Sequence, residues 1–105
     1  MTAADVREIV KRAMGSEWSR TNAHACDFKR CLVEPYMREF EDCGGPGAAG
    51  TVRLWVVLEE NPEECDGYQI VFEEQSGEFG LACPGLHGPI YLGRYGSFLR
   101  TFDAM

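Results

Sequence analysis

The segment 2–14 spaces its apolar residues with the period of a helix. They recur at i, i+3, i+4 and i+7, and are Val6, Ile9, Val10 and Ala13. Thr2 can cap this helix, with Asp5 three residues later as an aspartate version of the capping box. Gly15 follows Met14 directly, at a position where helices commonly end. The pattern therefore predicts an amphipathic helix over Thr2–Met14.

The middle of the chain changes to the period of two that is typical of strands. In 51–59 one face carries Val52, Leu54, Val56 and Leu58, and the other carries Trp55 and Val57. A strand with two apolar faces is covered on both sides, so this segment is predicted to be central in a sheet. Tyr68–Glu74 and Glu78–Ala82 are the next predicted strands, joined by a tight turn at 75–77. We expect the first of them to bury Tyr68, Ile70 and Phe72 and to turn Gln69 and Glu73 outward.

The segment before these strands is less regular. In 16–33, Asn22 can cap a short helix that buries Ala25, Phe28 and Leu32. Pro35 would end that helix, because the residue before a proline is pushed out of the helical region. Residues 36–41 fit either a strand or a short helix, and we favour a strand because the long strand after it needs a neighbour.

Glycine and proline mark the connections. The segment 43–50 is interpreted as a flexible hairpin connection, and 83–89 as a loop. Ile90–Leu92 is expected to be a short edge strand, and Ser97 to cap a last helix over Phe98–Ala104.

This order of elements predicts one α+β domain over residues 1–105. We expect an N-terminal helix, an antiparallel β-meander of three to five strands and a C-terminal helix, with the helices packed on one face of the sheet. The length of 105 residues and the apolar content of 45% suit a single hydrophobic core.

Composition adds an uneven charge. The chain has 17 acidic and 10 basic residues, a net charge of −7. This negative balance argues against nucleic-acid binding, which needs a stripe of basic residues. The chain also has no apolar run long enough to cross a membrane. Residues 54–93 contain eight acidic side chains and no lysine or arginine. They fall at two predicted turns: Glu59, Glu60, Glu63, Glu64 and Asp66 at the first, and Glu73, Glu74 and Glu78 at the second.

Two interpretations of this acidic region remain open. The functional one is a non-enzymatic interaction module (an adaptor, inhibitor or immunity-like protein) that contacts a basic protein partner through both turns. The other is that the acids keep the chain in solution and protect sheet edges from pairing. A third possibility is a small-ligand-binding protein with an apolar pocket between the first helix and the sheet.

Cysteine and histidine offer an alternative chemistry. The candidate zinc ligands are His24, Cys26, Cys31, Cys83 and His87. Zinc takes four such ligands, normally as two close pairs, but no C-x₂-C pair occurs in the chain. The odd number of cysteines, 5, and the absence of a leader-like N-terminus favour free thiols in the cytoplasm. The acids show no calcium-loop pattern.

Catalysis has weak support in the sequence. Gly45–Gly50 resembles a phosphate loop only superficially, because its lysine is missing and a strand follows it. A cysteine nucleophile would need a histidine base, and Cys83 with His87 or Cys26 with His24 are the candidate pairs. No cofactor is implied, and we expect a protein that is not an enzyme.

Overall fold

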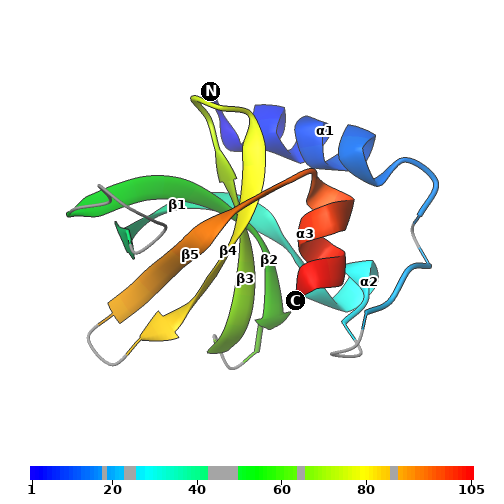
Figure 1. Ribbon diagram of the computed structural model, residues 1–105. Coiled ribbons are helices and arrows are strands. Elements are labelled where there is room, and N and C mark those ends of the chain that lie inside the picture. The colour runs from blue at the N-terminus through cyan, green and yellow to red at the C-terminus, as the bar shows by residue number, and fades with distance from the viewer. Residues whose placement is uncertain (18, 23–25, 43–49, 64–65, 86–87) are drawn as a thin grey trace.

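The computed structural model describes residues 1–17, 19–22, 26–42, 50–63, 66–85 and 88–105 (Figure 1). Along the chain the elements are α1 (Ala3–Met14), α2 (Phe28–Cys31), β1 (Leu32–Asp42), β2 (Thr51–Asn61), β3 (Asp66–Glu73), β4 (Glu78–Gly85), β5 (Gly88–Gly96) and α3 (Phe98–Ala104). The α+β class, the meander and the two terminal helices are as predicted. Residues 36–41 are strand, which settles the alternative that the sequence left open.

Local capping explains where the helices begin. Thr2 accepts a hydrogen bond from the backbone N–H of Asp5, and the Asp5 carboxylate accepts one from the N–H of Thr2 at 2.9 Å, the predicted capping box. Ser97 caps α3 through the N–H of Arg100 at 3.2 Å, also as predicted. The short helix α2 is capped by Asp27, so the prediction of an Asn22 cap was wrong.

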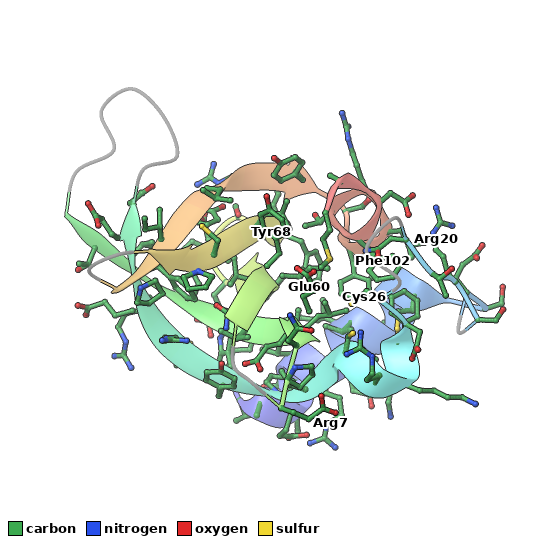
Figure 2. All side chains as sticks on the ribbon, turned by 90° about the horizontal axis from the view of Figure 1, so that it is seen from below. Arg7, Arg20, Cys26, Glu60, Tyr68 and Phe102 are labelled. Carbon is green, nitrogen blue, oxygen red and sulfur yellow. The ribbon has the colours of Figure 1, made fainter. Side chains whose placement is uncertain are left out.

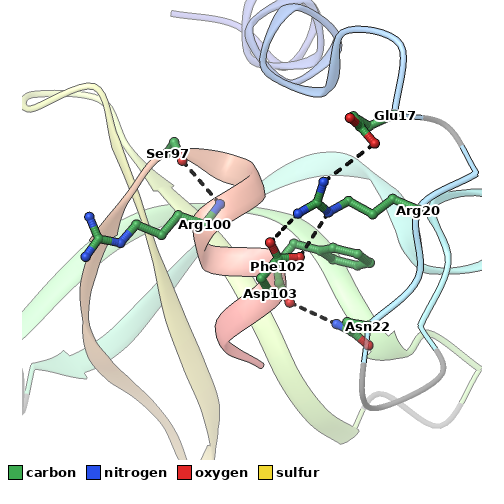
Figure 3. Close-up of polar contacts among 7 residues, drawn as sticks. All are labelled: Glu17, Arg20, Asn22, Ser97, Arg100, Phe102 and Asp103. Atoms are coloured by element: carbon green, nitrogen blue, oxygen red, sulfur yellow. Dashed lines mark hydrogen bonds and ion pairs between the residues drawn. The ribbon is translucent and has the colours of Figure 1, made fainter.

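Asn22 instead ties the segment before α2 to the C-terminal helix. Its side-chain N–H₂ donates to the carbonyl of Phe102 at 2.9 Å (Figure 3). Its Oδ1 accepts from the N–H of Cys26 at 3.2 Å. Next to it, Arg20 forms an ion pair with Asp103 of α3 and a second with Glu17 at 3.5 Å. The contacts of Asn22 with Phe102 and of Arg20 with Asp103 join residues that lie 80 and 83 positions apart.

The five strands close into a barrel. Consecutive strands pair antiparallel from β1 to β5, and β1 then pairs parallel with β5 through Glu41 opposite Ile90 and Asp42 opposite Tyr91. In a meander with an odd number of strands the first and last run in the same direction, so closure requires this parallel pair. The prediction that 90–92 form a short edge strand was therefore wrong, because β5 spans Gly88–Gly96 and pairs with both neighbours.

The predicted loop 83–89 is also shorter than expected, because Cys83–Gly85 continue β4 and Gly88 already begins β5. Residues 86–87 lie outside the described part. Residues 43–49 of the predicted flexible connection also lie outside the described part. On either side of them, the N–H of Asp42 donates to the carbonyl of Gly50 at 3.1 Å. Its two ends are thus joined as in a hairpin.

Two apolar clusters lie on the two faces of the sheet. The barrel interior takes side chains from all five strands, with Phe40, Leu54, Val56, Val71, Ala82 and Tyr91 buried there. The larger cluster lies outside the barrel, where α1, α2 and α3 cover β2, β3 and β4 (Figure 1). It is rich in aromatic contacts, including Phe28 against Phe102 with ring centroids 4.6 Å apart. The helices therefore occupy one face of the sheet, as predicted.

A register shift in β2 changes which residues enter the barrel. Strict alternation placed Leu58 on the face of Val56, but the β2–β3 register shifts between these two residues. Val57 and Leu58 consequently both belong to the outer cluster, and Glu59 turns toward the interior beside Gln69, its partner on β3. Gln69 is 4% exposed, so the expectation that it faces solvent was wrong.

Candidate interaction surface

Charge divides between the two layers of the molecule. Residues 32–96, which form the strands and their connections, carry 12 acidic and 3 basic side chains. Residues 1–31 and 97–105, which form the helices and the segments next to them, carry 5 acidic and 7 basic ones. The barrel layer is therefore strongly negative and the helical layer slightly positive.

The first predicted acidic turn is partly internal. Glu59 is 6% exposed, and its carboxylate accepts a hydrogen bond from the hydroxyl of Tyr36. Burial, and then its hydrogen bond to Glu59, raise the pKa of Tyr36 to about 12. The carboxylate of Glu60 accepts from the backbone N–H of Tyr68 at 3.1 Å (Figure 2 labels both residues). These two acids hold strands together and do not form an open contact surface.

The rest of this turn is described only in part. Glu63 is exposed, as a contact residue should be. Glu64 lies outside the described residues, and Asp66 is described only as the first residue of β3.

The second predicted acidic turn, between β3 and β4, holds its acids in specific contacts. Arg94 of β5 forms ion pairs with Glu73 at 2.7 Å and with Glu78 at 3.8 Å. Hydrogen bonding to Glu73 raises the pKa of Arg94. Glu74 accepts a hydrogen bond from the indole N–H of Trp55 at 3.0 Å, and the N-terminal amine lies 3.9 Å from the same oxygen. The acidic side chains of this turn are therefore held in place by their contacts with Arg94, Trp55 and the N-terminal amine.

A groove lies beside this network, between the β1–β2 and β3–β4 hairpins. Its volume is about 460 Å³, and its walls include Met37, Arg53, Trp55, Glu73, Glu74 and Arg94. We call this feature the hairpin groove. Met37 is 37% exposed, which is high for a large apolar side chain, and the acids Glu39 and Glu41 are exposed next to it on β1.

The hairpin groove also borders unpaired backbone. β2 pairs with β3 only from Trp55 onward, opposite Phe72. Within the described ranges, Thr51–Leu54 pair with β1 and have no strand on their other side. An open edge of this kind can accept an extended chain.

Sequence reasoning identified Glu73, Glu74 and Glu78 in this region but missed Met37, Arg53, Trp55 and Arg94. Arg94 had a usable signal, because it is the first basic residue after the acidic stretch 54–93. Met37 and Arg53 gave no signal, since their proximity to the turn depends on the curvature of the sheet.

The predicted zinc ligands are only partly described. Cys26 and Cys31 are both buried, and Cys83 is half-buried on β4, while His24 and His87 lie outside the described residues. Burial, followed by its hydrogen bond with Cys31, raises the pKa of the Cys26 thiol. Among residues whose placement is described, no group of three or more His, Cys, Asp and Glu side chains could hold a metal ion. Zinc binding and the cysteine–histidine pairs remain predictions.

The cavity expected between the first helix and the sheet lies between α1 and β1. It has a volume of about 200 Å³ and is lined mainly by aliphatic side chains, among them Val10, Met14, Leu32 and Val57. Arg7 and Glu34, which form an ion pair with each other, lie at its wall.

Comparison of the chain with protein-family models, with curated proteins and with solved structures finds no match. In the described part of the chain, none of the helices has the length and apolar character needed to cross a membrane.

Proposed function

We propose that this protein is a small acidic interaction module that holds a basic, extended segment of a partner protein in the hairpin groove. The observation that carries the proposal is the concentration of acidic charge on the barrel layer, 12 acidic against 3 basic residues, around the largest groove described above. Such a field attracts a positively charged partner and increases the rate of encounter.

The composition of the hairpin groove suits a protein partner. Aromatic residues, methionine and arginine are enriched at the centres of protein interfaces, and this groove has Trp55, Met37, Arg53 and Arg94 in its walls. Trp55 is held in place by its hydrogen bond to Glu74, so its ring loses little further freedom on binding.

The free edge of β2 supports an extended conformation of the bound segment. Backbone groups of Thr51–Leu54 on the side away from β1 can pair with an added strand. Lysine or arginine side chains of that strand would then lie near Glu74, with the exposed Glu39 and Glu41 of β1 two strand spacings away across β2.

A labelled peptide of alternating lysine and threonine tests the proposal by fluorescence anisotropy. We expect binding that weakens as salt is raised, and none by the matching peptide of alternating glutamate and threonine. The double variant E39Q/E41Q should bind the lysine peptide about two- to thirtyfold more weakly, since each exposed charge contributes about 0.2–1 kcal/mol.

The control is the double variant E8Q/E17Q, which loses the same charge from the helical layer and should bind as the unchanged protein does. If both double variants weaken binding equally, the interaction is a response to net charge and the hairpin groove is not its site. Equal binding of the glutamate peptide would also contradict the proposal.

A second candidate function follows from the cavity between α1 and β1. Its volume of about 200 Å³ and aliphatic lining suit a small apolar ligand, since apolar cavities of about 150 Å³ bind benzene. Titration with benzene should shift the methyl NMR signals of Val10 and Val57. The variant V33F, whose larger side chain would fill the cavity, should remove these shifts, and unchanged methyl signals in the original protein would exclude this function.

A further inference from the structure

The barrel opens at the end where β4 passes to β5. Among the described residues, β1 and β5 pair only at Glu41–Ile90 and Asp42–Tyr91, so the earlier part of β1 stands apart from the start of β5. A cavity of about 210 Å³ lies at this opening, with Arg38, Gln69, Pro84, Gly85, Gly88 and Pro89 in its walls. We call it the barrel mouth. The end of β4 and the start of β5, which contribute to it, lie away from the three helices in Figure 1.

Gln69 gives the barrel mouth an unused hydrogen-bonding group. The residue is 4% exposed, yet in the described part of the chain its side-chain amide has no hydrogen-bond partner. In the described part of the chain, every fully enclosed side-chain nitrogen or oxygen has a hydrogen-bond partner. Because the amide of Gln69 has no such partner, it is not fully enclosed, and the space open to it is the cavity that it lines. A ligand in the cavity would therefore find an amide that is not engaged by any other group of the described protein.

Arg38 brings a positive charge to the same cavity. Its side chain is exposed, and within the described ranges no carboxylate lies close enough to form an ion pair with it. Arg38 lies two residues before Phe40, which is buried in the barrel interior, so strand alternation places both residues on the inner side of β1. Glu59, the register partner of Gln69, already accepts a hydrogen bond from Tyr36.

Two prolines give the barrel mouth a rigid apolar wall. Pro84 and Pro89 are directly opposite each other in the β4–β5 register, and Gly85 is opposite Gly88 one step further along. Proline has no backbone N–H, so this part of the wall contributes ring surface and no donor. The cavity therefore combines a guanidinium and an amide with a small apolar area.

We propose that the barrel mouth binds a small monocarboxylate. The planar guanidinium of Arg38 matches the two oxygens of a carboxylate, and the amide of Gln69 supplies a further donor. The two proline rings contact the aliphatic body of the ligand. The volume of about 210 Å³ limits that body to a few carbon atoms. This site is separate from the hairpin groove and does not depend on the function proposed there.

Titration of ¹⁵N-labelled protein with sodium butyrate tests the inference. We expect shifts in the side-chain amide signal of Gln69 and in the backbone amides of Gly85 and Gly88. Butyramide, which has the same shape without the charge, should bind far more weakly. R38Q should weaken butyrate binding by about tenfold or more, as expected when a hydrogen bond to a charged group is lost.

The matched control is R100Q, which removes an exposed arginine from α3 and should leave the titration unchanged. If R38Q disturbs the fold, Q69L provides the second variant, followed through Gly85 and Gly88. The inference is wrong if butyrate does not shift the signals of Gln69, Gly85 and Gly88. It is also wrong if butyramide binds as strongly as butyrate, or if R38Q binds butyrate as strongly as the unchanged protein does.

Discussion

The hydroxyl of Tyr36 on β1 donates a hydrogen bond to the carboxylate of Glu59 on β2, and only 6% of Glu59 is exposed. An acid that the sequence places in a charged surface turn is therefore part of the barrel interior. Tyr36 also lies two residues before Arg38, so both are on the same face of β1 as the barrel mouth.

Removing the Tyr36 hydroxyl should destabilise the protein. In Y36F the buried carboxylate of Glu59 loses its donor, which we expect to lower the free energy of unfolding by about 1–3 kcal/mol. Urea unfolding followed by circular dichroism measures the change. Y95F is the matched control, because Tyr95 is 38% exposed against 37% for Tyr36. A loss of the same size in both variants would show that the contact with Glu59 contributes nothing.

Two tyrosines should make stability fall at high pH. Burial is the main cause that raises the pKa of Tyr36 and of Tyr91 to about 12, with Glu59 and Glu73 as the next causes. In the unfolded chain the pKa is about 10, so below that pH both states keep their protons and the stabilisation is complete. As the pH rises from about 10 to about 12, only the unfolded state loses protons, and the free energy of unfolding decreases.

Tyrosinate absorbance, measured as the folded protein is titrated, checks this directly. We expect a late phase near pH 12 that is smaller in Y36F, and a shallower loss of stability in that variant. The raised pKa of these two tyrosines would be contradicted if no tyrosine titrated above about pH 11.

Asn22 should matter more for stability than its place in a connecting segment suggests. N22A removes the bonds to the carbonyl of Phe102 and from the N–H of Cys26. Because these groups are half-buried, we expect a loss of about 1–3 kcal/mol in the free energy of unfolding. Q75A, at an exposed turn residue, should change it by less than about 0.5 kcal/mol. Thermal unfolding of the two variants side by side tests the difference.

Gly80 should tolerate no side chain. A Cβ at this position would lie 2.3 Å from the carbonyl oxygen of Gly93 and 2.8 Å from the ring of Tyr91. G80A should therefore force the barrel strands apart and lower the free energy of unfolding by about 3 kcal/mol or more. At Gly77 nothing lies within 4 Å, and only the φ of +72° opposes a side chain. G77A should thus cost about 1 kcal/mol. Equal effects on the denaturant midpoint would contradict the tight packing of β4 on β5.

Local patterns predicted much of this molecule. The capping box of Thr2 and Asp5, the Ser97 cap and the two apolar faces of β2 depend on residues near each other in the chain, so the sequence shows them directly. The acidic stretch 54–93 is also visible in the sequence, since composition does not depend on folding.

The sequence by itself determined the α+β class, the helix at each end, the meander and the negative charge of its strands. Tertiary structure decided the rest. Barrel closure depends on backbone pairing between Glu41 and Ile90, which leaves no mark in side-chain periodicity. The register shift after Val56 turns Glu59 and Gln69 inward, because one extra residue reverses the faces that follow. The hairpin groove and the barrel mouth each join residues from separate strands, and only the curvature of the closed sheet brings those residues together.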